Sequence, residues 1–375
     1  MSAPESKIIK KDFWLDHFPP QKFLTMPSVG IDISDRSIKY IQLTRKGGII
    51  VIQKKGSIPL AEGIISSGEI KNKEKLIELM RSIKEEINTP YIIAAMPEEK
   101  TFLSRIKLPL MKRYKIKEAL ELQLEEHVPL THDNAVFDFE IIKEKTSGPD
   151  NHIDVNIIAF PKDIVNDYVN IFKEAGLTPL AFEMEVQALA RAVVPQNDDE
   201  AYVVVDFGKT RTTLAIACEN KIQFTSTIKI AGDDLNNAIT KNLKVDIFRA
   251  EKIKKEQGFV RTKDNEEVFN ALLPVISTIK DEISRHISFW NSHLKTCDRE
   301  RSRVKKILIG GGDSNLFGFS EYLSYNLKMP VEQYNPWINL ISFDEYVPDM
   351  ELKESLLYAT AIGLALRSLI STKND

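Results

Sequence analysis

The chain has 375 residues, of which 43% are hydrophobic and 28% charged, and its formal net charge is -3. This length allows two or more domains with separate cores, and the composition is that of an ordinary globular protein. The small negative charge gives no broad electrostatic reason to bind nucleic acid. Cys218 and Cys297 lie far apart, which suits a reducing compartment and excludes a disulfide framework or a cysteine-based zinc site.

Membrane and metal signals are also weak. No run of about 18 apolar residues is present, and the N-terminus lacks the apolar core of a secretion signal. The chain ends in STKND directly after an apolar helix, so we expect no surface anchor there. His286 and His293 could share a helix face, but no carboxylate partner is evident, and a metal site there is not favoured.

One stretch organises the rest of the chain. VGIDISDRSIKYIQL, over Val29–Leu43, predicts a strand that ends in a carboxylate, a polar turn and a second strand. The same pattern returns as VVVDFGKTRTTLAI over Val203–Ile216, with Asp206 in the place of Asp32. Each turn offers backbone amides and hydroxyls to an anion, and each Asp could hold hydrated Mg²⁺. Two such hairpins could bind a triphosphate.

Either hairpin alone is better explained as an ordinary turn, and it is the repetition that favours a phosphate site. The letters GKT at Gly208–Thr210 resemble the end of a P-loop, but that motif needs a glycine where Val203 stands. We therefore reject a P-loop.

Residues 1–27 form a lead-in that combines basic and apolar residues. Lys7, Lys10 and Lys11 precede a group of large apolar side chains, namely Phe13, Trp14, Leu15, Phe18, Phe23 and Leu24. Such a cluster marks a partner or membrane contact when it is exposed. The alternatives, a segment that folds back on the body or a mobile tail, are equally compatible with the sequence.

The remaining elements follow from apolar periodicity and from turn residues. We expect strands over Val29–Ile33, Ile38–Leu43, Ile49–Lys54, Tyr91–Ala95, Thr101–Leu108, Phe137–Lys143, Ile153–Phe160, Pro179–Phe182, Tyr202–Asp206, Thr212–Cys218, Lys221–Ile228 and Lys305–Gly310. We expect helices over Lys71–Glu86, Tyr114–His127, Asp163–Ala175, Glu185–Val194, Leu316–Leu327 and Leu352–Ile370, with a turn at Thr146–Asn151 and mostly helical chain over Gly232–Trp290. A β-β-β-α unit is thus used twice, which indicates a duplicated fold.

Three further constellations are weak by themselves. Gly310–Gly312 is a glycine-rich turn between a strand and a helix, where the backbone could approach a ligand. Glu251 and Lys254 could form a surface pair or a polar edge around a nucleotide base. Glu183 and Glu185 could orient a water, although beginning a helix is the better explanation for either.

Together these motifs resemble the nucleotide pocket of the actin, Hsp70 and sugar-kinase superfamily over about residues 28–370. Within it, the chain is most similar to the PilM family of type IV pilus assembly. The stretches that carry this resemblance are GIDISDRSIKYIQL, AAMPEEKTFLSRIKLP, KEALELQLEEHVPL with FDFEII, AGLTPLAFEMEVQALARA and DFGKTRTTLAI.

The resemblance implies a duplicated α/β actin-like (ribonuclease H-like) ATPase fold with two lobes and four subdomains. The division is 28–97 and 181–200 for subdomain 1A, 98–180 for an inserted α+β subdomain 1C of the FtsA and PilM type, 201–231 and 305–375 for 2A, and 232–304 for 2B. Residues 1–27 stay outside it as the lead-in.

The resemblance also implies the ligands and their contacts. ATP and Mg²⁺ are the expected cofactors, with Asp32 and Asp206 holding Mg²⁺ through water. The expected nucleotide contacts are Asp32, Ser34, Ser37, Lys39, Asp206, Gly208, Thr210, Thr212, Gly232, Glu251, Lys254, Gly310, Gly311 and Gly312. Glu183 is the only candidate for a catalytic role, so we expect at most slow ATPase activity.

The expected role is a cytoplasmic adaptor, peripheral at the inner membrane through its partners. The partner implied is the N-terminal cytoplasmic peptide of the membrane protein PilN, in a groove that we place at Leu103–Leu110 and Lys117–His127. Other inner-membrane pilus proteins and motor ATPases are further candidates. Two other classes stay open: a membrane-linked cytoskeletal protein like FtsA, and a small-molecule kinase of the same superfamily.

Overall fold

The computed structural model of the chain describes residues 26–145, 151–196, 198–292, 303–340 and 346–369. The lead-in up to residue 25, all but the last residue of the expected turn at Thr146–Asn151, His293, Cys297 and Ile370 lie outside these residues. Contacts divide the chain into two compact units, each described by itself below. One comprises residues 1–32, 39–57 and 186–375, and the other residues 33–38 and 58–185.

Two five-stranded sheets carry the same strand order. The first is β3-β2-β1-β6-β10, built from Ile49–Pro59, Ser37–Lys46, Val29–Ile33, Tyr91–Met96 and Thr178–Met184. The second is β13-β12-β11-β14-β15, built from Lys221–Ile228, Thr212–Cys218, Ala201–Phe207, Val304–Gly310 and Val331–Gln333. In each sheet two hairpins are followed by two strands that arrive by crossovers. The predicted duplicated fold is confirmed, with each sheet built from its own half of the sequence.

The second sheet belongs to the first unit, and its register shows how the motifs meet. β11 pairs antiparallel with β12, and it pairs parallel with β14, so that Asp206 lies opposite Gly310. The buried positions of β11 and β12 are almost continuous, because helices cover the sheet and leave little of it to water. The carboxylate of the second hairpin and the glycine-rich turn therefore end at the same edge.

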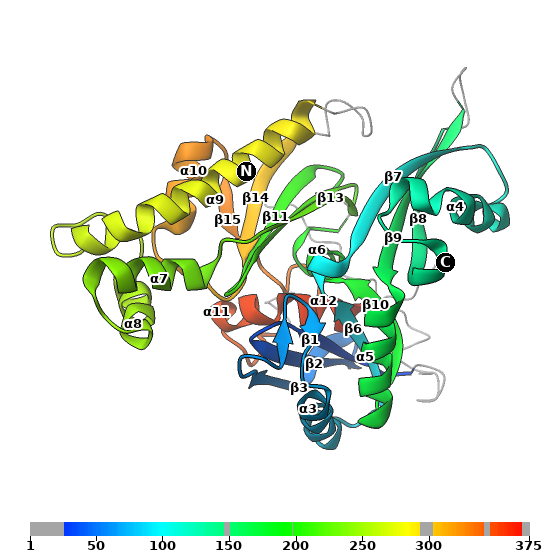
Figure 1. The fold of residues 1–375 in the computed structure, drawn as a ribbon, viewed down its shortest axis with the longest axis horizontal. Coiled ribbons are helices and arrows are strands. Elements are labelled where there is room, and N and C mark those ends of the chain that lie inside the picture. The colour runs from blue at the N-terminus through cyan, green and yellow to red at the C-terminus, as the bar shows by residue number, and fades with distance from the viewer. Residues whose placement is uncertain (1–25, 146–150, 197, 293–302, 341–345, 370–375) are drawn as a thin grey trace. The chain divides into compact units, whose positions relative to one another are not determined.

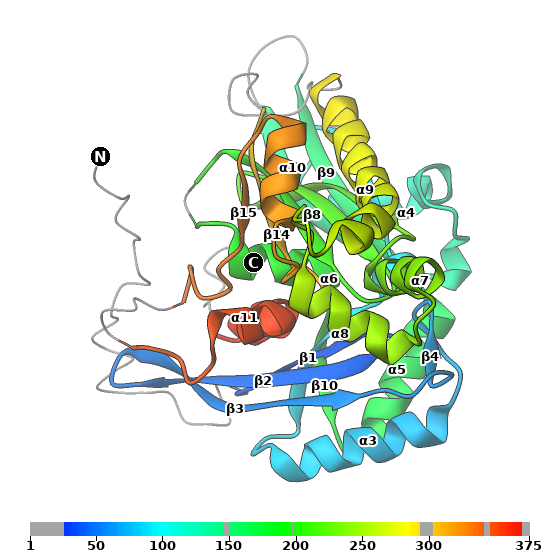
Figure 2. The same ribbon diagram turned by 90° about the vertical axis from the view of Figure 1, so that its left-hand side faces the viewer.

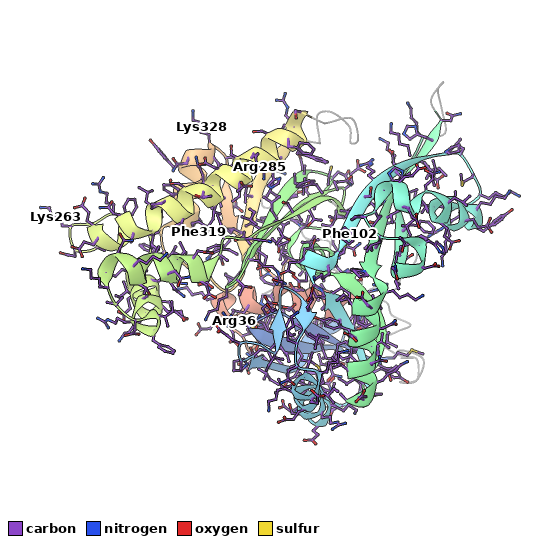
Figure 3. The ribbon with its side chains drawn as sticks, in the orientation of Figure 1. Arg36, Phe102, Lys263, Arg285, Phe319 and Lys328 are labelled. Atoms are coloured by element: carbon purple, nitrogen blue, oxygen red, sulfur yellow. The ribbon has the colours of Figure 1, made fainter. Side chains whose placement is uncertain are left out.

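The helices of the first unit are α6 (Glu185–Val193), α7 (Gly232–Leu243), α8 (Ile247–Gln257), α9 (Glu266–Ser292), α10 (Phe319–Leu327), α11 (Leu352–Ser355) and α12 (Ala359–Arg367), with the first residue of α6 assigned to the other unit. Figure 1 shows α7, α8 and α9 grouped beside the second sheet. Phe319 packs against Phe207 in the shared core, with the rings tilted and 5.1 Å between their centroids. Lys263 and Lys328, in contrast, are exposed at the periphery, as Figure 3 shows.

The second unit contains a small α+β module. Its three-stranded sheet has the order β7-β9-β8, from Phe102–Pro109, His152–Pro161 and Ala135–Lys145, and α4 (Arg113–His127) covers it. Leu120 and Leu124 of α4 share a core with Ile106 and Leu108 of β7. In the same unit α3 (Lys73–Glu86) lies beside α5 (Lys162–Glu174), where Lys73 pairs with Asp167 at 2.5 Å. The proposed division into subdomains stays a prediction.

Most predicted elements are confirmed within two residues at their ends, and two helices are shorter than predicted. The helix expected from Leu316 begins at Phe319, because Gly318 before it has φ +84°, outside the helical region. The continuous helix expected over Leu352–Ile370 is wrong, since α11 gives way to a 3₁₀ turn at Leu356–Tyr358 before α12. Ser355 donates to the Leu352 carbonyl there, a side-chain bond that competes with helical pairing.

Several short elements left no signal in the sequence. They are β4 (Ile65–Ser66), β5 (Glu69–Ile70), β15, and 3₁₀ turns at Glu98–Lys100 and His132–Asn134. Within the described ranges, no helix is both long and apolar enough to cross a membrane.

Candidate functional site

The two repeated carboxylates lie in the same compact unit. Asp32 is the fourth residue of β1 and only 8% exposed, and Asp206 is the sixth residue of β11 and partly exposed. Burial raises the pKa of Asp32, and the charges of Lys39 and Arg211 oppose this rise. Burial, together with the charge of Asp32, raises the pKa of Asp206 to about 6. The two carboxylates are therefore close enough to repel each other.

This pair has the chemistry of a cation site. Two nearby carboxylates resist ionisation together unless positive charge is added between them. Lys39 and Arg211 supply part of that charge, since each lowers the pKa of both Asp residues. Among the described residues, no group of three His, Cys, Asp or Glu side chains could enclose a metal.

The second hairpin is tied to the start of α7. The amides of Gly232 and Asp233 donate to the carbonyls of Gly208 and Lys209 at 3.1 and 2.8 Å. Thr212 is fully buried, and its hydroxyl donates to the Ile230 carbonyl at 2.6 Å. Thr210 is partly exposed at the turn. The loop is thus held rigidly, and the roles of Gly208, Thr210 and Thr212 as phosphate ligands stay predictions.

The tip of the first hairpin, described in the other unit, is organised by its serines. The Ser37 amide donates to Ser34 Oγ at 3.2 Å, and the two hydroxyl oxygens lie 3.2 Å apart. Asp35 accepts from the amides of Ser67 and Gly68 at 3.1 and 3.2 Å, so its carboxylate is stabilised by the β4–β5 turn. Ser34 and Ser37, the two predicted phosphate ligands of this hairpin, therefore lie in the same small turn.

The glycine-rich turn is packed directly on the carboxylate. A Cβ at Gly311 would stand 2.2 Å from Asp206 Oδ1, and Gly311 has φ +94°, a conformation that disfavours other residues. A Cβ at Gly310 would meet the ring of Tyr334 at 1.9 Å. Burial raises the pKa of Tyr334 well above 10, with the charge of Asp206 as the next cause, so the phenol stays protonated. The turn requires glycine at both positions, because the Asp206 carboxylate and the Tyr334 ring occupy the space that a side chain would need.

Glu251 and Lys254, which the sequence suggested as a pair, each form ion pairs with other residues. Glu251 contacts Lys255 at 2.7 Å and Lys209 at 3.6 Å, and its side chain is 33% exposed. Lys254 is 3% exposed, donates to the Gly232 carbonyl at 3.2 Å and pairs with Asp313. Lys254 therefore connects α8, the start of α7 and the residue that follows the three glycines.

We expect Lys254→Met to destabilise the protein by about 3 kcal/mol, because it leaves the Asp313 carboxylate partly buried without its cation. Lys254→Met combined with Asp313→Leu should recover at least half of that loss, since neither charge then remains. Urea unfolding of both single variants and the double variant measures the coupling. Additive losses across the three would contradict this assignment.

Glu183 and Glu185 stand at the end of β10 and the start of α6, with 5% and 8% exposure. Both belong to the second unit, where Glu183 pairs in register with Ala95 of β6. Glu185 occupies the first turn of α6, where a negative charge favours the helix dipole. The catalytic role of Glu183 stays a prediction.

Two residues of this region were missed in the sequence. Asp313 carried a signal, because it directly follows the three glycines at a predicted turn. Tyr334 carried none, since it lies just after the three-residue strand β15, which no periodicity reveals. The contact of Asp313 with Lys254, and that of Tyr334 with the space beside Gly310, both follow from tertiary packing rather than from local pattern.

The repeated sheets, each with a carboxylate at the end of its first strand, define an actin-like ATPase fold. The solved PilM–PilN type IV pilus biogenesis complex contains a chain with a TM-score of 0.76 and 20% identity, covering 92% of this chain and 99% of that one. EutJ of Carboxydothermus hydrogenoformans gives 0.53 at 18% identity, covering 90% and 89%. MreB5 of Spiroplasma citri bound to AMPPNP gives 0.51 at 14%, covering 91% and 96%. Identities this low establish the fold alone.

Among curated proteins, the cell division protein FtsA of Staphylococcus epidermidis is 23% identical over 226 residues. The match covers 54% of this chain and 46% of that protein, so the chain spans about half the length of the curated relatives it matches. The family described as type IV pilus assembly protein PilM matches residues 30–369. The chain belongs to this family and is an actin-like protein of type IV pilus assembly.

Proposed function

We propose that the protein is an ATP-binding adaptor of type IV pilus assembly that binds the N-terminal peptide of PilN. In this proposal, bound nucleotide changes the equilibrium between conformations, and that equilibrium controls peptide binding. The solved relatives support the proposal, because one belongs to a PilM–PilN complex and another was solved bound to AMPPNP. The proposed location is the cytoplasm, at the inner membrane through such partners.

The observation that carries the nucleotide part is the pair Asp32 and Asp206. Burial and mutual repulsion raise the pKa of Asp206 to about 6, although Lys39 and Arg211 oppose the rise. A site with this excess of negative charge is stabilised by a divalent cation. When bound, Mg²⁺ with ATP would supply that charge, and both carboxylates would hold its waters.

The other predicted contacts have separate roles. Ser34, Ser37, Gly208, Thr210 and Thr212 would bind phosphates through amides and hydroxyls. A second group, formed by Gly232, Glu251, Lys254 and the turn Gly310–Gly312, would frame the adenosine. Lys254 would hold the start of α7 and the chain after Gly312 in place, since its amine contacts the Gly232 carbonyl and Asp313.

Turnover should be slow in this proposal. General-base catalysis needs a group with a suitable pKa within reach of the attacking water. Glu183 is our one candidate, and Asp32 and Asp206 would hold the metal. A binding switch with slow hydrolysis suits an adaptor better than a metabolic enzyme.

The proposed peptide groove lies in the α+β module, at Leu103–Leu110 and Lys117–His127. There α4 packs on β7 through Leu120 and Leu124, while Leu122 on the same helix is 87% exposed. An exposed leucine of this kind can contact an apolar peptide side chain without supporting the core. Leu122 is therefore the residue through which the groove can be tested.

The test is calorimetric titration with a synthetic PilN N-terminal peptide, with and without Mg-ATP. We expect micromolar binding that responds to nucleotide in the wild type and loses that response in Asp206→Ala. Leu122→Asp should weaken peptide binding about tenfold. Tyr325→Asp, at a residue 85% exposed on α10, is the matched control and should leave it unchanged. Absent peptide binding with Mg-ATP still bound would instead favour an FtsA-like function.

A further inference from the structure

A pocket of about 560 Å³ lies in the first unit, and neither Asp32 nor Asp206 lines it. It is formed by β3 and by the chain around α11, which Figure 2 shows beside β2 and β3. Its apolar wall consists of Trp337, Val347, Pro348, Met350 and Leu352. This volume falls within the range of about 300–1,000 Å³ typical of ligand pockets, and it could take one or two large side chains.

The pocket combines a buried tryptophan with exposed apolar side chains at its rim. Trp337 is 1% exposed, and its indole N–H has no hydrogen-bond partner among the described residues. At the rim, Val347 is 71% exposed and Leu352 is 49% exposed. A buried donor without a partner and large exposed apolar side chains both cost free energy in water. An apolar occupant would cover the exposed rim and so relieve the second of these costs.

The charges around the pocket are unbalanced. Lys55 donates to the Asp349 carbonyl at 2.8 Å and pairs with Glu354 at 3.0 Å, so its own charge is matched. Asp349 and Glu351 also line the pocket, are exposed, and form no ion pair with any residue that the structure describes. The rim therefore favours an occupant that carries lysine or arginine beside its apolar side chains.

One segment of this chain has that chemistry. We propose that residues 7–15, KIIKKDFWL, bind in this pocket within the same chain. Their lysines would face Asp349 and Glu351, and a large side chain such as Trp14 would enter against Trp337. This segment complements the pocket in charge and in polarity, since three of its nine residues are lysines and five are large apolar residues.

The tether is long enough for this arrangement. β1 begins at Val29, and β3, which carries Lys55, is two strands away in the same sheet, about 10 Å. The eleven Cα-to-Cα steps from Leu15 to Met26 can span up to about 36 Å when extended. Binding within one chain also gives a high effective concentration, so modest contacts suffice. A basic, apolar peptide from another protein would then have to displace this segment.

The test uses the full chain with Trp14 replaced by photo-reactive benzoylphenylalanine. We expect cross-links within one chain, mapped by mass spectrometry to residues 346–354. Val347→Asp and Glu351→Lys should each reduce this product about tenfold, because one removes an apolar contact and the other reverses a rim charge. Phe248→Asp, at a residue 83% exposed on α8, is the control and should leave the product unchanged.

Three results would overturn the proposal. Cross-links to other parts of the same chain would assign a different surface. Products only between isotopically distinct chains would assign the pocket to a second copy. Products in this region that need added anionic vesicles would assign the lead-in to a membrane. None of these results bears on nucleotide or PilN binding, so this proposal and the proposed function fail independently.

Discussion

Asp206→Asn should stabilise the ligand-free protein at pH 7.5. Burial and the charge of Asp32 raise the pKa of Asp206 to about 6 from 3.8. An acid with a raised folded-state pKa binds more protons when folded, so stability falls as pH rises from about 4 to 6. The full shift corresponds to about 3 kcal/mol, and because Asp206 is partly exposed we expect Asn to recover about 1–2 kcal/mol.

Thermal unfolding between pH 4 and 8 measures this effect. The variant should gain over the wild type as pH rises, with no gain at pH 4, where the wild-type carboxyl is already protonated. Asp198→Asn is the control of opposite sign. Burial raises the pKa of Asp198, but hydrogen bonds from Tyr202 and the Glu200 amide outweigh it and lower the pKa. That variant should lose stability at high pH, and a loss in Asp206→Asn as well would contradict the account.

Gly363→Ala should destabilise the protein by about 3 kcal/mol or more, or prevent folding. Gly363 lies inside α12, where alanine normally stabilises a helix by about 0.5–1 kcal/mol. Here the added Cβ would stand 1.7 Å from the Ala188 carbonyl oxygen of α6, a backbone atom that cannot rotate away. Overpacking against fixed backbone moves the helices apart and removes buried contacts.

Urea unfolding at constant pH measures the loss. Gly312→Ala is the matched control, because the nearest atom to its Cβ is the movable Leu357 Cδ2 at 3.0 Å, and we expect less than about 1 kcal/mol. Arg191 also donates to the Gly363 carbonyl at 2.9 Å, so separation of α6 and α12 would break this bond. Equal effects of the two substitutions would show that the close approach is not what glycine provides.

Local chemistry explains why much of the fold was predictable. Apolar runs bounded by charged turns located both hairpin pairs, and β12 and β13 have the predicted ends. The helices of the α+β module followed from apolar spacing and from Gly176, which ends α5 with φ +76°. Strands of two or three residues carry too little pattern to be seen, and the break in the last helix depends on tertiary packing.

Repetition in the sequence was enough to bring the two carboxylates together as candidates. Asp32 and Asp206 stood at equivalent places in two similar stretches, and the structure places both in one unit, where the charge of Asp32 helps to raise the pKa of Asp206. Lys254 was predicted as a ligand from its spacing to Glu251, yet its neighbour in space is Asp313, 59 residues away in sequence. Contacts of that range depend on how helices pack, and one sequence alone does not contain that information.

Two carboxylates that repel each other cost stability while no cation lies between them. A ligand that stabilises such a site must first offset the free-energy cost of the empty site. Its observed affinity therefore reflects both that cost and the contacts it makes. The raised pKa of Asp206 is therefore the physical link between the stability of the empty site and its proposed use for Mg-ATP.

Calorimetric titration with ATP, with Mg²⁺ and with EDTA, tests the central claim most directly, on the wild type, Asp206→Asn and the surface control Phe248→Asp. We predict binding by the wild type and the control that depends on Mg²⁺, and a loss of about tenfold or more in Asp206→Asn. Binding of equal strength in all three proteins, or binding indifferent to EDTA, would contradict the assignment of Asp32 and Asp206 to a metal–nucleotide site.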